Sequence, residues 1–71
     1  MKQSTIKQIN EHLEKARKKH PKFADTDYQI ISIATEELGE LAQAVNDGKI
    51  TKTKSEAADL IAVLIRMVEG D

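Results

Sequence analysis

Residues 57–68 read Ala-Ala-Asp-Leu-Ile-Ala-Val-Leu-Ile-Arg-Met-Val, and this stretch decides the fold. It contains neither proline nor glycine, and its apolar residues occur on almost every side of a helix with 3.6 residues per turn. A helix that is apolar all round has to be covered all round. Two further helices from so short a chain can hardly supply that cover. We therefore expect a homo-oligomer in which this helix lies near the centre of a four-helix arrangement.

Two breaks divide the chain into three segments. Pro21 ends the first segment, because proline has no amide hydrogen to donate and disfavours helix in the residue before it. Asn46-Asp47-Gly48 ends the second, with Gly48 suited to a left-handed helix cap. The segments about 4–19, about 26–46 and about 54–69 show helical periodicity without strand-like alternation.

These segments predict an all-α fold and a single domain over residues 1–71. The connection 47–53 is short, which favours antiparallel packing of the second and third helices. We expect these antiparallel helices of a three-helix chain to complete a four-helix-type bundle by oligomerisation, as a homodimer or a homotetramer.

The composition limits what can stabilise the chain. A protein of 71 residues buries a modest fraction of its surface, and the absence of cysteine excludes both disulfides and thiolate metal sites. Metal held by carboxylates, or self-association, must then add stability. The N-terminus has no apolar signal core, and no segment is apolar for the roughly 18 residues of a membrane span. We expect a cytoplasmic protein with no membrane partner.

Charge is distributed unevenly, although the net charge is only −1. Residues 1–24 carry seven Lys or Arg against two Glu, a net +5, whereas residues 25–71 carry four against ten Asp or Glu, a net −6. A dedicated nucleic-acid-binding module presents one uniformly basic surface, so nucleic acid is not the favoured partner. The basic run 15–22 is interpreted as the solvated last turn of the first helix, where cations complement the helix dipole.

Four carboxylates lie where a soluble helix normally carries apolar side chains. At about 100° per residue, Glu37 falls inside the apolar arc of the second helix and Glu40 borders it. Glu56 falls in the middle of the most apolar stripe of the third helix, and Asp59 lies at its edge. Each pair is spaced i, i+3 and projects from one face of its helix. Because burying ionised carboxylates is costly, cations or protons must neutralise some of them.

An all-oxygen cluster of this kind favours a hard divalent cation, Mg²⁺ or, as a substitute, Mn²⁺. Two plainer readings compete with a metal site: Glu56 can close a capping box with Thr53, and the acids of the second helix can form a solvated stripe. We favour a joint site, because both pairs are displaced into apolar faces of adjacent helices. Gly39, a helix-interior glycine between the acids, predicts that a backbone or a ligand comes close there.

The sequence Glu36-Glu37-Leu38-Gly39-Glu40, followed by Glu56-Ala57-Ala58-Asp59, resembles the EExxE…ExxD signature of the MazG-like all-α nucleotide pyrophosphohydrolases, and the similarity covers roughly residues 28–68. The resemblance implies hydrolysis of a ribo- or deoxyribonucleoside triphosphate between the α and β phosphorus atoms, which removes nucleotides from the pool. It also implies dimers or tetramers. By position it implies Glu37, Glu40, Glu56 and Asp59 as the ligands of Mg²⁺. Glu36 would be an outer-shell residue or the catalytic base that helps activate water.

The sequence departs from the family pattern at Gly70-Asp71, where members commonly continue into a helix with phosphate-binding cations, so we expect a domain shortened at its C-terminus. Phosphate contacts would then come from Lys52, Lys54 or Lys49, or from a neighbouring subunit. The alternative function belongs to another class: a non-catalytic, metal-stabilised helical oligomerisation or interaction module of the same fold.

The histidines and aromatic residues are interpreted as structural. His12 and His20 have no Glu three residues earlier, which excludes the Glu-x-x-His ligand pairs of di-iron bundles, and both are expected at the surface. Phe23 and Tyr28 are expected to pack at the junction of the first two helices.

Overall fold

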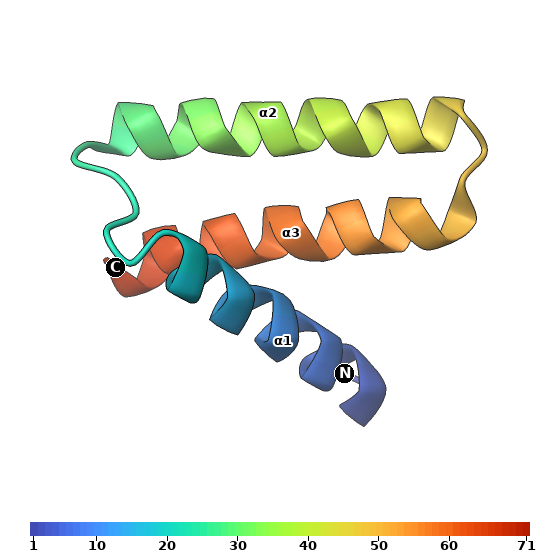
Figure 1. Ribbon diagram of the computed structural model, residues 1–71, viewed down its shortest axis with the longest axis horizontal. Coiled ribbons are helices and arrows are strands. Elements are labelled where there is room, and N and C mark those ends of the chain that lie inside the picture. Colours follow the sequence, from blue (N-terminus) through green and yellow to red (C-terminus); the bar gives the residue numbers. More distant parts are fainter.

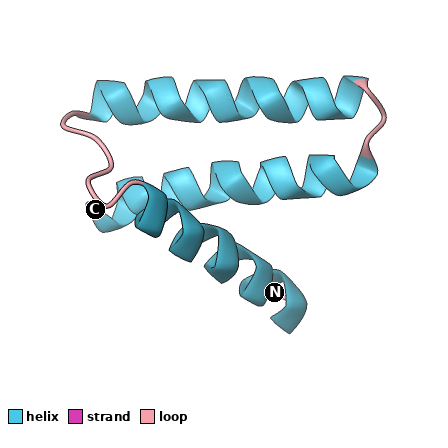
Figure 2. Ribbon diagram, viewed as in Figure 1, coloured by secondary structure: helices cyan, strands magenta, loops and turns pink.

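The computed structural model describes residues 1–71 and consists of three α-helices joined by two short loops (Figure 2). Helix α1 spans Gln3–Lys19, α2 spans Asp27–Asn46 and α3 spans Ile50–Glu69. No strand is present. The all-α prediction is confirmed, and both loops lie at the predicted breaks.

Helices α2 and α3 run antiparallel and side by side, as predicted, while α1 crosses α3 at an angle (Figure 1). α3 packs against both other helices, whereas α1 and α2 do not pack against each other. The radius of gyration is 12.3 Å. This is slightly above the roughly 11 Å typical of a compact domain of this length. The excess follows from the divergence of α1 and α2 on either side of α3.

The predicted start of α3 is wrong by four residues. The helix begins at Ile50, and the Thr53 hydroxyl donates to the Lys49 carbonyl at 2.8 Å instead of capping a helix start. The capping-box interpretation of Thr53 and Glu56 is therefore excluded. The reversal from α2 needs only residues 47–49, because Gly48 adopts a φ of 68°, which glycine accepts without strain. The start of α2 lies one residue from its prediction, with Thr26 accepting from the Gln29 amide at 3.2 Å.

The core is small and is built around short side chains. Buried apolar residues come from all three helices: Leu13, Ala44, Ala58, Ala62 and Val63. Alanine at these positions lets the helices approach closely. α3 is nevertheless not covered all round within one chain, because Ile61, Leu64 and Val68 remain exposed.

Arg66 holds the C-terminal end of α1 against α3. Its side chain is 1% exposed, and its guanidinium donates to the carbonyls of Ala16 at 3.2 Å and His20 at 2.8 Å. The same group lies 4.4 Å from the centre of the Phe23 ring. The Ala16 carbonyl also accepts the backbone amide of His20 at 2.9 Å, so Arg66 adds a second donor there and bonds the His20 carbonyl just beyond the end of α1. The packing prediction for Tyr28 is wrong, because its side chain is 90% exposed.

None of the three helices has the length and apolar character that crossing a membrane requires.

Candidate metal centre

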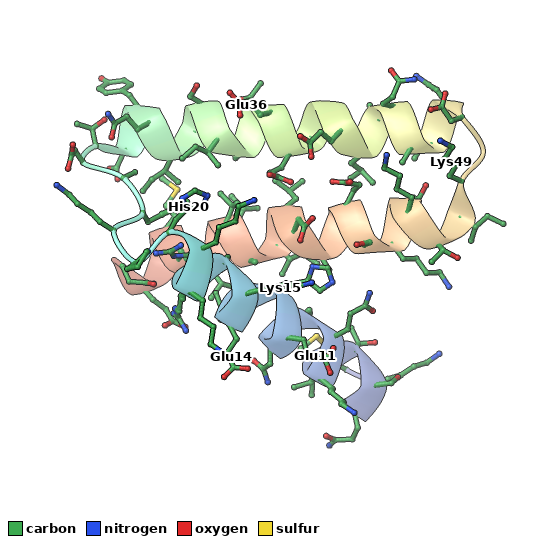
Figure 3. The ribbon with its side chains drawn as sticks, viewed as in Figure 1. Glu11, Glu14, Lys15, His20, Glu36 and Lys49 are labelled. Carbon is green, nitrogen blue, oxygen red and sulfur yellow. The ribbon has the colours of Figure 1, made fainter.

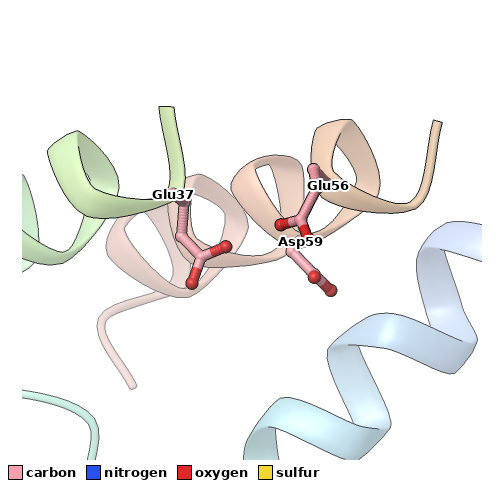
Figure 4. Close-up of side chains that lie close together, drawn as sticks. All are labelled: Glu37, Glu56 and Asp59. Carbon is pink, nitrogen blue, oxygen red and sulfur yellow. The ribbon is translucent and has the colours of Figure 1, made fainter. Parts of the chain in front are cut away.

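Three of the four predicted ligands come together between α2 and α3. Glu37 extends from α2 and Glu56 extends from α3 toward it, while Asp59 extends from α3 beside Glu56, toward α1 (Figure 4). One carboxylate oxygen from each residue lies within 4.8 Å of the other two. Residues 19 and 22 positions apart in sequence meet in this way because the antiparallel turn at Gly48 lies between them.

Local helix geometry presents these side chains to one another. Glu56 and Asp59 are one turn apart on α3, so both project from the same side of that helix. Glu37 lies near the middle of α2, facing the first half of α3. Both helices are regular over these residues, so the separation of the carboxylates depends on how closely α2 and α3 pack.

Two oxygens of the cluster have no partner. Oε2 of Glu37 and Oε2 of Glu56 are buried and accept no hydrogen bond. A buried polar atom without a partner is costly, and the cost is larger when the group is ionised. Neither Glu37 nor Glu56 forms an ion pair with a cation of the chain.

The surroundings of Glu37 and Glu56 favour the protonated forms of both groups. Burial raises the pKa of Glu37, and the negative charges of Glu40 and Asp59 raise it further. Burial also raises the pKa of Glu56, followed by the close approach of Glu40. Raised carboxylate pKa values of this origin mean that the cluster lacks positive charge.

The donor set fits a hard divalent cation. Carboxylate oxygens are the ligands that Mg²⁺ and Mn²⁺ prefer, and no nitrogen or sulfur ligand is needed. A cation placed among the three carboxylates would satisfy the two partnerless oxygens and offset the mutual repulsion of the acids.

The other two predicted acids lie at the margin of the cluster. Glu40 is exposed and is outside the group of three, yet it is close enough to raise the pKa of both Glu37 and Glu56. Glu36 is also exposed, and its side chain lies outside the space between α2 and α3 (Figure 3). Its charge makes the smallest of the contributions that raise the pKa of Glu37.

The lysines predicted to bind phosphate differ in position. Lys52 lies one turn before Glu56 on α3, and its charge acts on the Glu56 carboxylate by lowering its pKa, against the larger effects that raise it. Lys54 is two residues from Glu56, so it points about 160° away around the helix. Lys49 lies in the loop before α3 (Figure 3). Of the two lysines within α3, only Lys52 shares the side that carries the acids.

His12 is the residue of this region that sequence reasoning placed wrongly. It was expected at the surface, but its side chain is half-buried and its Nδ1 lies 2.5 Å from Oδ1 of Asp59. A contact between residues 47 positions apart leaves no local signal in the sequence. His20 is exposed, as predicted.

Gly39 and the surface hollows add no further ligand. A side chain at Gly39 would meet nothing within 4 Å, so the backbone contact predicted there is absent from the chain. None of the three carboxylates lines either of two surface hollows, of about 260 and 420 Å³, although His12, the partner of Asp59, lines the first. The first is polar and lies along α1, and the second is mostly apolar and lies along the last two turns of α3.

No protein-family model, curated protein or solved structure gives a significant match to this chain.

Proposed function

We propose that this chain is a Mg²⁺-dependent nucleoside triphosphate pyrophosphohydrolase, which converts a ribo- or deoxyribonucleoside triphosphate to the monophosphate and pyrophosphate. The observation that carries the proposal is the group of carboxylates from two helices, in which buried oxygens of Glu37 and Glu56 have no partner. The motif resemblance of residues 36–59 supports the same reading.

Acids without cations are poorly suited to bind a triphosphate, because like charges repel. Glu37, Glu40, Glu56 and Asp59 are therefore proposed to hold Mg²⁺, with Mn²⁺ as a substitute, and not to contact the substrate directly. The cation supplies positive charge that offsets the phosphate oxygens and orients the reacting groups. Lys52 is proposed to contact a phosphate, because it shares the acidic side of α3.

The proposed reaction is attack of water on the α phosphorus. The bond between that phosphorus and the oxygen bridging to the β phosphorus breaks, and pyrophosphate leaves with the electron pair. Glu36 is the proposed acceptor of the water proton on the motif resemblance; its exposed carboxylate lies next to Glu37 on α2 but outside the space between the helices, so it has to turn toward the three acids to act. General-base catalysis of this type contributes about 10²- to 10⁴-fold to a rate.

The test is pyrophosphate release from a panel of ribo- and deoxyribonucleoside triphosphates, with Mg²⁺ and then with EDTA. We expect release that requires Mg²⁺ and that falls at least about 100-fold in Glu56→Gln. Glu14→Gln is the matched control, because Glu14 is an exposed acid on α1 that makes no ion pair. Folded wild-type protein that releases pyrophosphate from none of the nucleotides would contradict the proposal.

We also propose that the chain assembles as a homo-oligomer, completing a four-helix-type bundle. Apolar side chains form a stripe on α2 at Ile31, Leu38 and Val45, and another on α3 at Ala57, Ile61, Leu64 and Val68. Leu38 is 54% exposed and Val68 is 86% exposed. An apolar surface of this extent on a small chain is typical of an interface.

The two stripes lie on one side of the α2–α3 pair. Each residue of a stripe comes one position after a residue that faces the other helix. Leu38 follows Glu37 on α2, and Ala57 follows Glu56 on α3. A step of one residue turns each helix by about 100°. Because the helices are antiparallel, the two turns lead to the same side. α1 lies on the opposite side, with Asp59 and His12, so pairing through the stripes leaves the acids accessible.

The size of this face supports pairing with a second copy. α2 and α3 have 20 residues each. At 1.5 Å per residue and about 10 Å between axes, they present a face of roughly 30 by 20 Å. Two such faces bury about 1,200 Å² together, which is the lower end of the range for stable interfaces.

The alternative proposal is a metal-stabilised interaction module without catalysis. The observation that favours it is the same exposed apolar face, which an interaction module uses directly. Metal binding and self-association without pyrophosphate release from any nucleotide would support this alternative over the enzyme.

A further inference from the structure

His12 reaches the proposed metal centre from a helix that supplies none of the predicted ligands. It lies in the middle of α1, and its ring nitrogen Nδ1 is 2.5 Å from Oδ1 of Asp59 on α3. The His12 side chain is 19% exposed and that of Asp59 is 43% exposed. This bond is the only hydrogen bond between a side chain of α1 and a member of the carboxylate group.

Two residues that follow His12 fix its position along α1. The next residue, Leu13, is buried in the contact with α3. One turn further, the Ala16 carbonyl accepts from the buried guanidinium of Arg66, which anchors α1 to the same helix that carries Asp59. The packing of two helices, and not a flexible loop, therefore holds the imidazole next to Asp59.

Asp59 is the member of the carboxylate group that this hydrogen bond holds in place. It lies at the edge of the cluster, and its half-exposed carboxylate has no other hydrogen bond. A bond to Oδ1 restricts rotation of the carboxylate and leaves Oδ2 available. Carboxylates that bind metals are in turn hydrogen-bonded by outer residues, whose loss typically lowers metal affinity about 10- to 100-fold.

We propose that His12 is a positioning residue of the metal centre: it donates from Nδ1 to Asp59 and orients that carboxylate toward the cation held with Glu37 and Glu56. The inference rests on the metal site of the proposed function. It assigns α1 a role in metal affinity, which the predicted ligand set, confined to α2 and α3, does not contain.

The test is Mn²⁺ binding to the full chain, measured by titration calorimetry and by electron spin echo of the bound ion. His12→Leu keeps a similar bulk without a donor, and His12→Asn keeps a donor nitrogen, since asparagine Nδ2 and histidine Nδ1 are both two bonds from Cβ. His20→Leu is the matched control, because His20 is an exposed histidine on the same segment of chain. Circular dichroism establishes that each variant is folded.

We expect His12→Leu to weaken Mn²⁺ binding about 10- to 100-fold, with His12→Asn and His20→Leu within a few-fold of wild type. Wild-type affinity in His12→Leu would overturn the inference while leaving the metal site in place. Equal weakening in His12→Leu and His12→Asn would also overturn it, since bulk or ring shape would then matter and not donation. A directly bound nitrogen in the spin-echo spectrum would make His12 a ligand instead. Wild-type protein that binds no Mn²⁺ would overturn this inference and the proposed function together.

Discussion

At the scale of single residues, individual acids of the cluster lower the stability of the folded chain when no cation is bound. Glu37 and Glu56 are partly buried among other acids, and each has a buried carboxylate oxygen without a partner. Their raised pKa values mean that the folded chain binds protons at these groups more tightly than the unfolded chain does. The folded state is therefore destabilised wherever both states are ionised.

Replacing Glu37 by Gln in EDTA should raise the melting temperature by a few degrees at pH 7. The sign follows from linkage: above the raised pKa the charge of Glu37 costs stability, and that cost disappears as the pH falls toward the ordinary value of 4.5. The gain from Glu37→Gln should therefore shrink between pH 7 and pH 4.5. Thermal unfolding at several pH values measures it, and a gain that is constant with pH would contradict the assigned cause.

Adding Mg²⁺ should reverse the order of stability at pH 7. Wild type gains about 2.7 kcal/mol when the free ion is at 100 times its dissociation constant. Glu37→Gln, which lacks one carboxylate of the cluster, should gain much less. Urea unfolding with MgCl₂, compared with NaCl at equal ionic strength, separates binding from screening. Equal stabilisation of the two proteins by Mg²⁺ would argue against Glu37 as a ligand.

At the scale of the helices, two threonines show that a residue suited to capping does not always mark a helix start. Thr26 caps α2 by accepting from the Gln29 amide, whereas Thr53 lies inside α3 and donates to a backbone carbonyl. Thr26→Ala should destabilise the protein by about 1 kcal/mol, the usual cost of losing an N-cap. Thr53→Ala should change stability far less. Urea unfolding of both variants decides the point, and a larger loss for Thr53→Ala would favour a helix start near residue 54.

The interior of α2 offers a second test at this scale. Gly39 has an ordinary helical φ, and a Cβ there meets nothing within 4 Å. Gly39→Ala should therefore stabilise the folded chain by about 1 kcal/mol, the difference in helix propensity. Chemical unfolding of the nucleotide-free protein gives the value. A loss of stability would mean that another chain approaches α2 at this glycine.

At the scale of the whole molecule, three helices leave one face of the α2–α3 pair uncovered. Leu38→Lys should convert the proposed oligomer into a monomer, because the apolar interface would bury the new charge without a partner. Ser32→Lys is the matched control: Ser32 is exposed on α2 about 120° away from Leu38. Sedimentation velocity at several concentrations reports the mass. A wild-type chain that remains monomeric throughout would contradict the proposed assembly.

The sequence by itself determined the three helices and the direction in which the acids project. Pro21 and Gly48 break the chain, and backbone hydrogen bonds at a period of 3.6 residues fix which side chains share a face. Glu56 and Asp59 therefore had to lie together on α3. The short connection after α2 favoured the antiparallel pair, which brings Glu37 to them.

Tertiary structure alone decided the contacts of α1 and the start of α3. His12 meets Asp59, and Arg66 meets the end of α1, because α1 crosses α3 at an angle set by the packing of side chains such as Leu13. No periodic pattern in the sequence encodes this crossing angle. The early start of α3 likewise depends on Gly48 reversing the chain within three residues. Local spacing is fixed by bonds along one helix, whereas contacts between helices depend on how their surfaces fit.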